Sequence, residues 1–87
     1  MKKAIVVGAT SGIGLEVARL LAKRGDKVGV AGRRVERLAE AVKSTEGIVT
    51  YRQIDVNDEN APIKLRELIA ELGGMDLYFH SSGIGWE

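Results

Sequence analysis

The chain has no cysteine, and its 87 residues include a single proline. Without thiols there is neither a disulfide framework nor a thiolate metal site, and one proline is too little to mark a linker between domains. Long apolar runs are missing as well, since the stretch from Ala4 to Ala9 is far short of the roughly 20 residues that span a bilayer. Because Met1, Lys2 and Lys3 lead into a strand and not into a signal peptide, we expect a cytoplasmic protein without a membrane segment.

A surplus of either charge is also absent. Thirteen lysine and arginine residues stand against 12 aspartate and glutamate residues, which leaves a formal net charge of +1. This balance gives no electrostatic reason to expect nucleic acid or an anionic membrane as a partner. Hydrophobic residues at 45% and charged residues at 29% are typical of a globular chain. We therefore expect one domain over residues 1–87, small enough that folding buries only about 60% of its surface.

What the chain does have is two hydrophobic periodicities that alternate along the sequence, one typical of strands and one typical of helices. Short β-branched and apolar runs predict strands at residues 4–7, 28–31, 48–54 and 76–80, the first of them buried on both faces. Between them, apolar residues spaced three and four apart predict helices over residues 12–24, 35–42 and 62–72. In the first helix we expect the buried face to hold Ile13, Val17, Leu20 and Leu21. Gly25 and Gly73 are placed to end the first and the third helix.

This order of strands and helices predicts an α/β fold. The short connections favour a Rossmann-like, doubly wound parallel sheet with helices on both of its faces. By analogy with such sheets, we expect the strand order 3-2-1-4. The crevice at the carboxyl ends of strands 1 and 4, where this order reverses direction, is the place where such sheets bind ligands.

A glycine-rich loop follows the first strand and opens the first helix. It reads Gly8-Ala9-Thr10-Ser11-Gly12-Ile13-Gly14. In this context Gly8 permits a tight turn, Gly12 lets the backbone approach a phosphate, and Gly14 lets the helix pack closely. Thr10 and Ser11 add hydroxyl donors beside the free N–H groups of the helix N-terminus. The alternative interpretation is a loop that needs glycines only in order to turn.

The spacing Gly-x-x-x-Gly-x-Gly resembles the opening motif of the short-chain dehydrogenase/reductase family, Thr-Gly-x-x-x-Gly-x-Gly, with Val7 in place of the threonine. The resemblance covers essentially the whole chain, but only the N-terminal, cofactor-binding portion of such an enzyme. It implies an oxidoreductase that transfers hydride between a nicotinamide dinucleotide and a carbonyl or alcohol substrate. It also implies that the cofactor is bound by Gly8, Thr10, Ser11, Gly12, Ile13 and Gly14.

The residues after the second strand bear on the choice of nucleotide. An acidic residue there would hold the ribose 2′-hydroxyl of NAD, but this chain has Gly32, Arg33 and Arg34. With no carboxylate to repel a phosphate, and with a guanidinium to grip one, the place suits the 2′-phosphate of NADP. The resemblance implies the same preference for NADP(H) over NAD, with Arg33 favoured over Arg34. The alternatives are that both arginines are only solvated, or that Arg34 pairs with an acidic neighbour.

Asp55 and Val56 close the third strand, on the edge of the predicted cleft. The resemblance implies that the Asp55 carboxylate accepts a hydrogen bond from the adenine amino group and that the backbone of Val56 assists. The alternative is that Asp55 only caps the turn into Asn57 and Asp58.

A second Ser-Gly-Ile-Gly begins at Ser82, after the fourth strand. Phe79 stands where the turn glycine would be needed, so this segment is not a second pyrophosphate loop. It resembles the family's Asn-Asn-Ala-Gly segment, which implies that Ser81, Ser82 and Gly83 line the far wall of the same cleft. For His80 we favour a packing role at the end of a buried strand over a catalytic one.

Catalysis in the family rests on a tyrosine followed four residues later by a lysine, with the tyrosine as general acid and base. In this chain Asp55 follows Tyr51 at that distance, and Ser82 follows Tyr78. We therefore expect no catalytic residue and no metal site, and an 87-residue chain that is inactive alone. It is either a fragment of a longer enzyme or a chain that forms homo-oligomers through the bare edge of its fourth strand. The alternative function is a stand-alone nucleotide-binding or regulatory module without catalysis.

Overall fold

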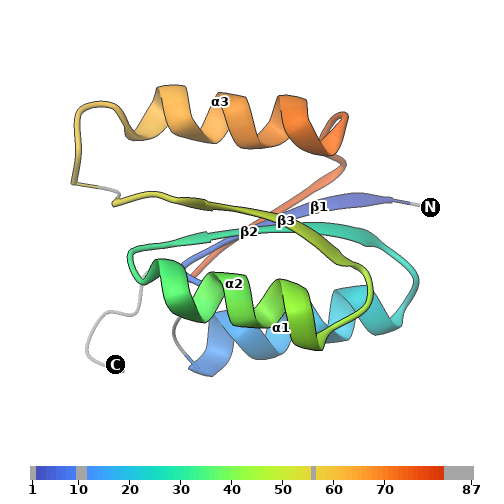
Figure 1. Ribbon diagram of the computed structural model, residues 1–87. Helices are drawn as coiled ribbons and strands as arrows, with labels where there is room; N and C mark the ends of the chain where they lie inside the picture. The colour runs from blue at the N-terminus through green and yellow to red at the C-terminus, as the bar shows by residue number, and fades with distance from the viewer. Residues whose placement is uncertain (1, 10–11, 56, 82–87) are drawn as a thin grey trace.

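The computed structural model describes residues 2–9, 12–55 and 57–81. Within these residues, strands and helices alternate strictly (Figure 1). The strands are β1 (Lys3–Val7), β2 (Lys27–Gly32), β3 (Ile48–Gln53) and β4 (Leu77–His80). The helices are α1 (Gly12–Lys23), α2 (Val35–Ser44) and α3 (Ala61–Leu72). The predicted elements and their order are confirmed, and none of the described helices is long and apolar enough to cross a membrane.

The strands form one parallel sheet in the order β3-β2-β1-β4, which confirms the predicted order. Val7 pairs with Ala31 of β2 on one side and with His80 of β4 on the other, and Gly32 pairs with Gln53. The carboxyl ends of the strands therefore meet at one edge, on the left in Figure 1, where α1 and α2 begin. Helices α1 and α2 cover one face of the sheet and α3 covers the other (Figure 1).

Two apolar layers hold the helices to the sheet. Side chains alternate across a strand, so β1 sends Val6 into the layer under α1 and α2, and Ile5 into the layer under α3. Both side chains are fully buried. The prediction that the first strand is buried on both faces is thus confirmed, and β1 is the central support of the loop that follows it.

The buried face of α1 differs from the predicted one. Of the predicted residues, Leu21 is buried and Val17 packs partly buried against the core, but Ile13 and Leu20 are 57% and 60% exposed. Gly14, Ala18 and Ala22 are buried as well. The prediction was wrong for Ile13 and Leu20 because it ranked residues by hydrophobicity alone. Small residues at positions 14, 18 and 22 lie on one helical face and bring the helix axis close to the sheet, whereas larger side chains there would hold it away.

Glycines end two of the helices as predicted. Gly25 after α1 and Gly73 at the C-cap of α3 have φ angles of +102° and +93°, which glycine adopts without steric cost. The carbonyls at the end of α3 also accept hydrogen bonds from two ammonium groups. Lys3 Nζ lies 3.0 Å from the Gly73 oxygen and Lys27 Nζ lies 3.2 Å from the Leu72 oxygen. These cations sit at the negative end of the helix dipole and stabilise the α3–β4 turn.

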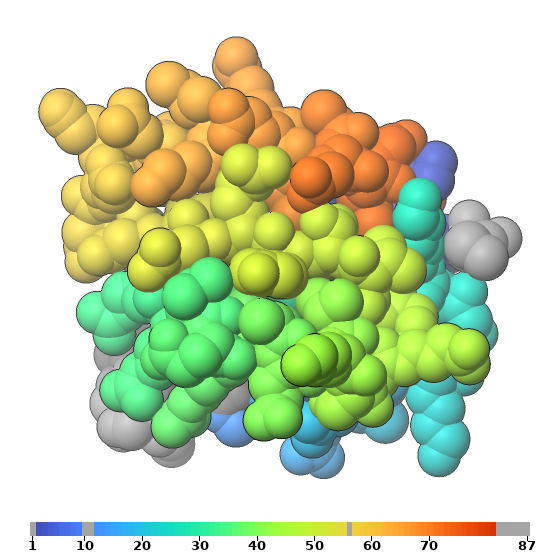
Figure 2. Space-filling view, viewed as in Figure 1, coloured from blue at the N-terminus to red at the C-terminus, as the bar shows by residue number. Residues whose placement is uncertain are grey.

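The two edges of the sheet differ in chemistry. On β3, Arg52 forms ion pairs of 3.2 Å with Glu67 and 3.6 Å with Glu71, and Thr50 donates to Glu71. Figure 2 shows this edge as a surface between α3 above and α2 below. On the other edge, β4 carries no charged side chain, and Leu77 and Tyr78 are 38% and 43% exposed. Among the described residues the fourth strand is therefore a bare edge of the sheet, as predicted.

The turn between α1 and β2 is held by a buried carboxylate. Asp26 is 6% exposed, and its Oδ2 accepts a hydrogen bond of 2.5 Å from Arg24 Nη2. Replacing Arg24 by alanine leaves this carboxylate buried without its cation. We expect Arg24→Ala to lower the free energy of unfolding by about 1–3 kcal/mol, measured by urea denaturation, because an unpaired buried acceptor keeps its desolvation cost. Lys23→Ala, at the exposed neighbouring position, is the control and should change it by less than about 0.5 kcal/mol; equal effects of the two substitutions would contradict the prediction.

Candidate functional site

The loop between β1 and α1 is a tight backbone turn anchored on β2. The N–H groups of Gly8 and Ala9 both donate to the carbonyl of Ala31, at 2.8 and 3.0 Å. Gly8 has a φ of +85°. A Cβ on Gly8 would lie 2.5 Å from the Ser81 oxygen, and one on Gly14 would lie 2.3 Å from the Gly8 oxygen. Both positions therefore require glycine, for the turn and for the close approach of α1, as the sequence predicts.

Gly12 is in a different position. Apart from its chain neighbours and the backbone of α1, a Cβ built there meets no atom of the described residues within 4 Å, and its φ lies outside the left-handed region. The packing of the described residues thus gives no reason for a glycine at the first residue of α1. What the missing side chain provides is open space beside the N–H groups of the helix N-terminus, in which an anion can approach the backbone.

The end of β4 lies against the same loop. The N–H of Ser81 donates to the Val7 carbonyl at 2.9 Å, and the Ser81 carbonyl faces Gly8. Gly8 and Ser81, which precede the two Ser-Gly-Ile-Gly copies, therefore lie against one another. His80 packs edge-on against Tyr78, with 6.2 Å between ring centroids, and is exposed, so the predicted burial of His80 is wrong. The predicted site residues Thr10, Ser11, Val56, Ser82 and Gly83 lie outside the described residues.

Two arginines follow β2 at the same edge of the sheet. Arg33 and Arg34 are both exposed, and none of the ion pairs between described residues uses either of them. The predicted alternative of an ion pair between Arg34 and an acidic neighbour is therefore not seen in the described part of the chain. Arg34 is instead the N-cap of α2, where its carbonyl accepts from the N–H groups of Arg37 and Leu38. The two guanidinium groups thus face solvent beside a strand end that has no carboxylate.

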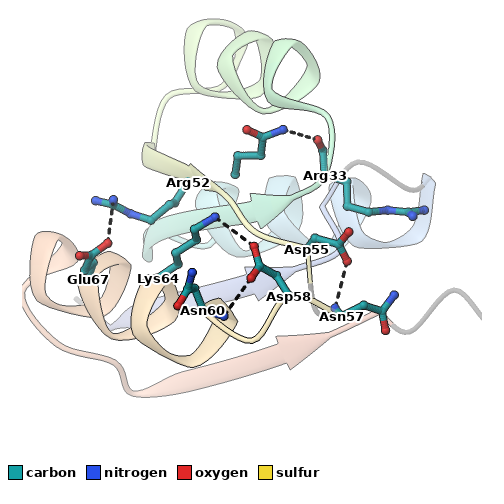
Figure 3. A network of polar contacts seen from close by, with 9 residues as sticks. Arg33, Arg52, Asp55, Asn57, Asp58, Asn60, Lys64 and Glu67 are labelled. Carbon is teal, nitrogen blue, oxygen red and sulfur yellow. Dashed lines mark hydrogen bonds and ion pairs between the residues drawn. The ribbon is translucent and has the colours of Figure 1, made fainter.

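The turn after β3 is built by aspartates. Asp55 Oδ1 accepts a hydrogen bond of 3.0 Å from the Asn57 N–H, so the turn-capping role predicted as an alternative is present (Figure 3). Asp58 Oδ1 accepts from the Asn60 N–H at 2.9 Å, and Lys64 Nζ lies 3.6 Å from its Oδ2. The hydrogen bond from Asn60 and then the Lys64 charge hold the pKa of Asp58 below its ordinary value. A lowered folded-state pKa means that this carboxylate favours the fold at neutral pH and loses its effect as the pH falls.

The sequence interpretation missed one polar residue at the carboxyl edge of the sheet. Gln53, the only glutamine of the chain, ends β3 and donates from Nε2 to the Arg33 carbonyl at 2.9 Å. The signal was an amide at the end of a strand, which we read only as part of that strand. Among the described residues there is no group of three or more metal-ligating side chains.

These features define a doubly wound, Rossmann-like fold whose glycine turn lies at the carboxyl edge of the sheet. A family model described as short chain dehydrogenase matches residues 2–87. The chain therefore belongs to the short-chain dehydrogenase family.

Relatives and solved structures agree with this family. An uncharacterized oxidoreductase of Listeria monocytogenes is 39% identical over 87 residues, covering 95% of this chain and 35% of that protein. The crystal structure of a variant actinorhodin polyketide ketoreductase with NADPH superimposes with a TM-score of 0.82 and 32% identity, over 92% of this chain and 32% of that chain. An alcohol dehydrogenase of the archaeon Thermococcus sibiricus, complexed with 5-hydroxy-NADP, gives 0.76 and 28%, over 90% and 35%. The chain thus spans about a third of the length of the proteins that it matches.

Proposed function

We propose that this chain is the NADP(H)-binding portion of an oxidoreductase, and that residues 1–87 form a single, partial dinucleotide-binding domain. One observation carries the proposal. Beside the glycine turn, β2 ends at Gly32 and is followed by Arg33 and Arg34. Both arginines are exposed, and there is no carboxylate among these three residues. A 2′-phosphate on the adenosine ribose is the group that such a cationic strand end accommodates. The NADPH and 5-hydroxy-NADP complexes of two similar structures support the same cofactor.

The residues present fit a dinucleotide. The open space at Gly12 admits a phosphate to the N–H groups of α1, and Gly8 and Gly14 hold the turn in shape. Thr10, Ser11 and Ile13 belong to the same pyrophosphate loop. Arg33, with Arg34 second, binds the 2′-phosphate. Asp55, already oriented by the Asn57 N–H, and Val56 contact the adenine, and Ser81, Ser82 and Gly83 form the far wall.

When bound, NADPH supplies a hydride to a carbonyl substrate, and NADP⁺ accepts one from an alcohol. The chain's own residues bind and orient the adenosine half of that cofactor. The proton that accompanies hydride must come from another part of the parent protein, because neither tyrosine of this chain is followed four residues later by a lysine.

The purified 87-residue chain is therefore expected to show no catalytic turnover. Incubated with NADPH and a panel of aldehydes and ketones, it should give no oxidation of NADPH above the rate without protein, measured by the loss of nicotinamide absorbance. The parent protein, if it carries the Tyr-x-x-x-Lys motif, is the positive control. Substrate-dependent oxidation by the short chain would contradict the absence of an acid and base group.

The second candidate is a nucleotide-binding or regulatory module without chemistry, and the gene sequence distinguishes it from the first. It predicts a stop codon directly after the codon for Glu87, whereas the first proposal predicts a continuing reading frame that encodes Tyr-x-x-x-Lys. The uncharged β4 edge is then the surface through which short chains would pair. For either function we propose a cytoplasmic location.

A further inference from the structure

The side chain of Gln53 connects β3 to the loop between β2 and α2. Its Nε2 donates a hydrogen bond of 2.9 Å to the backbone carbonyl of Arg33, drawn as a dashed line in Figure 3. A carbonyl oxygen only accepts, so the amide nitrogen of Gln53 must face it. Because Gln53 pairs with Gly32 in the sheet, this bond extends the connection between the strands by one residue, to Arg33.

Among the described residues, little else from side chains fixes the loop that receives this bond. Gly32 has no side chain, and the Arg34 N-cap forms no side-chain capping hydrogen bond. The backbone is held on either side of Arg33, by the bond from the Ile54 N–H to the Gly32 carbonyl at 2.8 Å and by α2 from Arg34 onward. The peptide between Arg33 and Arg34 lies between these points, and Gln53 holds its carbonyl.

We propose that Gln53 is a positioning residue for recognition of the 2′-phosphate. By fixing the Arg33 carbonyl it sets the direction in which the guanidinium leaves the backbone, without itself contacting the nucleotide. A loop that is ordered before binding loses less conformational entropy when the phosphate arrives. Gln53 affects the affinity for NADP⁺ and not the affinity for NAD⁺, because only NADP⁺ carries the 2′-phosphate. This inference rests on the proposed NADP(H) site.

The experiment combines Gln53→Met with Arg33→Ala in a double-mutant cycle. Methionine keeps the length and neutrality of glutamine but cannot donate. Dissociation constants for NADP⁺ and NAD⁺ are measured by calorimetry for the wild-type 87-residue chain, both single variants and the double variant. We expect Gln53→Met to weaken NADP⁺ binding about three- to tenfold and to leave NAD⁺ binding unchanged. In the Arg33→Ala background it should have no further effect, because Gln53 acts through that guanidinium.

Thr50→Val is the matched control. It removes another side-chain hydrogen bond of β3, to Glu71, at the end of the strand away from the loop. It should leave the ratio of the two dissociation constants unchanged. A second readout needs no nucleotide: the NMR order parameter of the Arg34 amide should fall in Gln53→Met and not in Thr50→Val.

The outcomes separate the two proposals. If Arg33→Ala lowers the NADP⁺ preference but Gln53→Met does not, the role of Gln53 is overturned and the NADP(H) site stands. If Gln53→Met weakens both nucleotides equally, or acts equally with and without Arg33, or leaves the Arg34 order parameter unchanged, its positioning role is likewise overturned. If Arg33→Ala leaves the preference unchanged, or the wild-type chain binds neither nucleotide, the proposed function fails and this inference fails with it.

Discussion

Gly14→Ala is expected to destabilise the chain strongly. Among the glycines of the loop between β1 and α1, only Gly8 is expected to tolerate an added methyl group less well. The new Cβ would lie 2.3 Å from the backbone oxygen of Gly8 and 2.9 Å from its carbonyl carbon. Backbone atoms cannot rotate away as a side chain does, so α1 or the loop must shift. We expect a loss of about 2–4 kcal/mol in the free energy of unfolding, measured by urea denaturation. For a domain of this size that is a large part of its total stability.

Gly12→Ala is the matched control, two residues away on the same helix. Its Cβ meets no atom of the described residues within 4 Å outside its chain neighbours and the backbone of α1, so the fold should tolerate it. Alanine has the higher helix propensity, and we expect stability equal to the wild type or higher by up to about 1 kcal/mol. Binding of NADP⁺ should nevertheless weaken by about tenfold or more, because the methyl group stands where a phosphate would approach the backbone.

Each of the two glycine predictions has a result that would contradict it. A Gly14→Ala chain as stable as the wild type would show that α1 does not pack on Gly8 as described. A stable Gly12→Ala chain that binds NADP⁺ like the wild type would show that the open space at Gly12 does not receive the pyrophosphate. Stability and binding are thus tested separately by two residues of one loop.

Arg33→Ala is expected to remove most of the preference for NADP⁺. A charge-assisted contact between a guanidinium and a phosphate contributes about 1.5–3 kcal/mol, which corresponds to a loss of about 10- to 150-fold in affinity. Affinity for NAD⁺ should not fall, since it has no 2′-phosphate. Dissociation constants for both nucleotides, measured by calorimetry on the same preparation, check this result.

The control for Arg33→Ala changes the net charge by the same amount. Arg66 is an exposed residue of α3, on the face of the sheet away from α1 and α2. Arg66→Ala should leave both affinities unchanged. Equal losses of NADP⁺ affinity in the two variants would mean that overall charge, and not the position of Arg33, attracts the nucleotide.

Hydrophobic periodicity and the glycines were enough to predict the strands and the helices, and analogy with doubly wound sheets supplied the strand order. Strands such as β1 are short, β-branched and bounded by glycine, and Gly8, Gly25 and Gly73 have the positive φ angles for which glycine is used. Local sequence carries these features because the backbone conformation of a turn depends on the residue in it. The requirement for glycine at position 14 was also predictable from the loop motif.

Other features depend on packing and could not be predicted from the sequence. Hydrophobicity favoured Ile13 and Leu20 for the buried face of α1, but the small residues of that helix take the place against the sheet. The hydrogen bond between Gln53 and the Arg33 carbonyl joins residues 20 positions apart, and only the parallel register of β2 and β3 brings them together.

The NADP(H) site is tested most directly by titrating the wild-type 87-residue chain with NADP⁺ and with NAD⁺ under identical conditions at low salt. The two exposed arginines at the end of β2 predict saturable, one-to-one binding with NADP⁺ at least about tenfold tighter than NAD⁺. Equal affinities, or a preference for NAD⁺, would contradict the assignment of Arg33 and Arg34 to the 2′-phosphate.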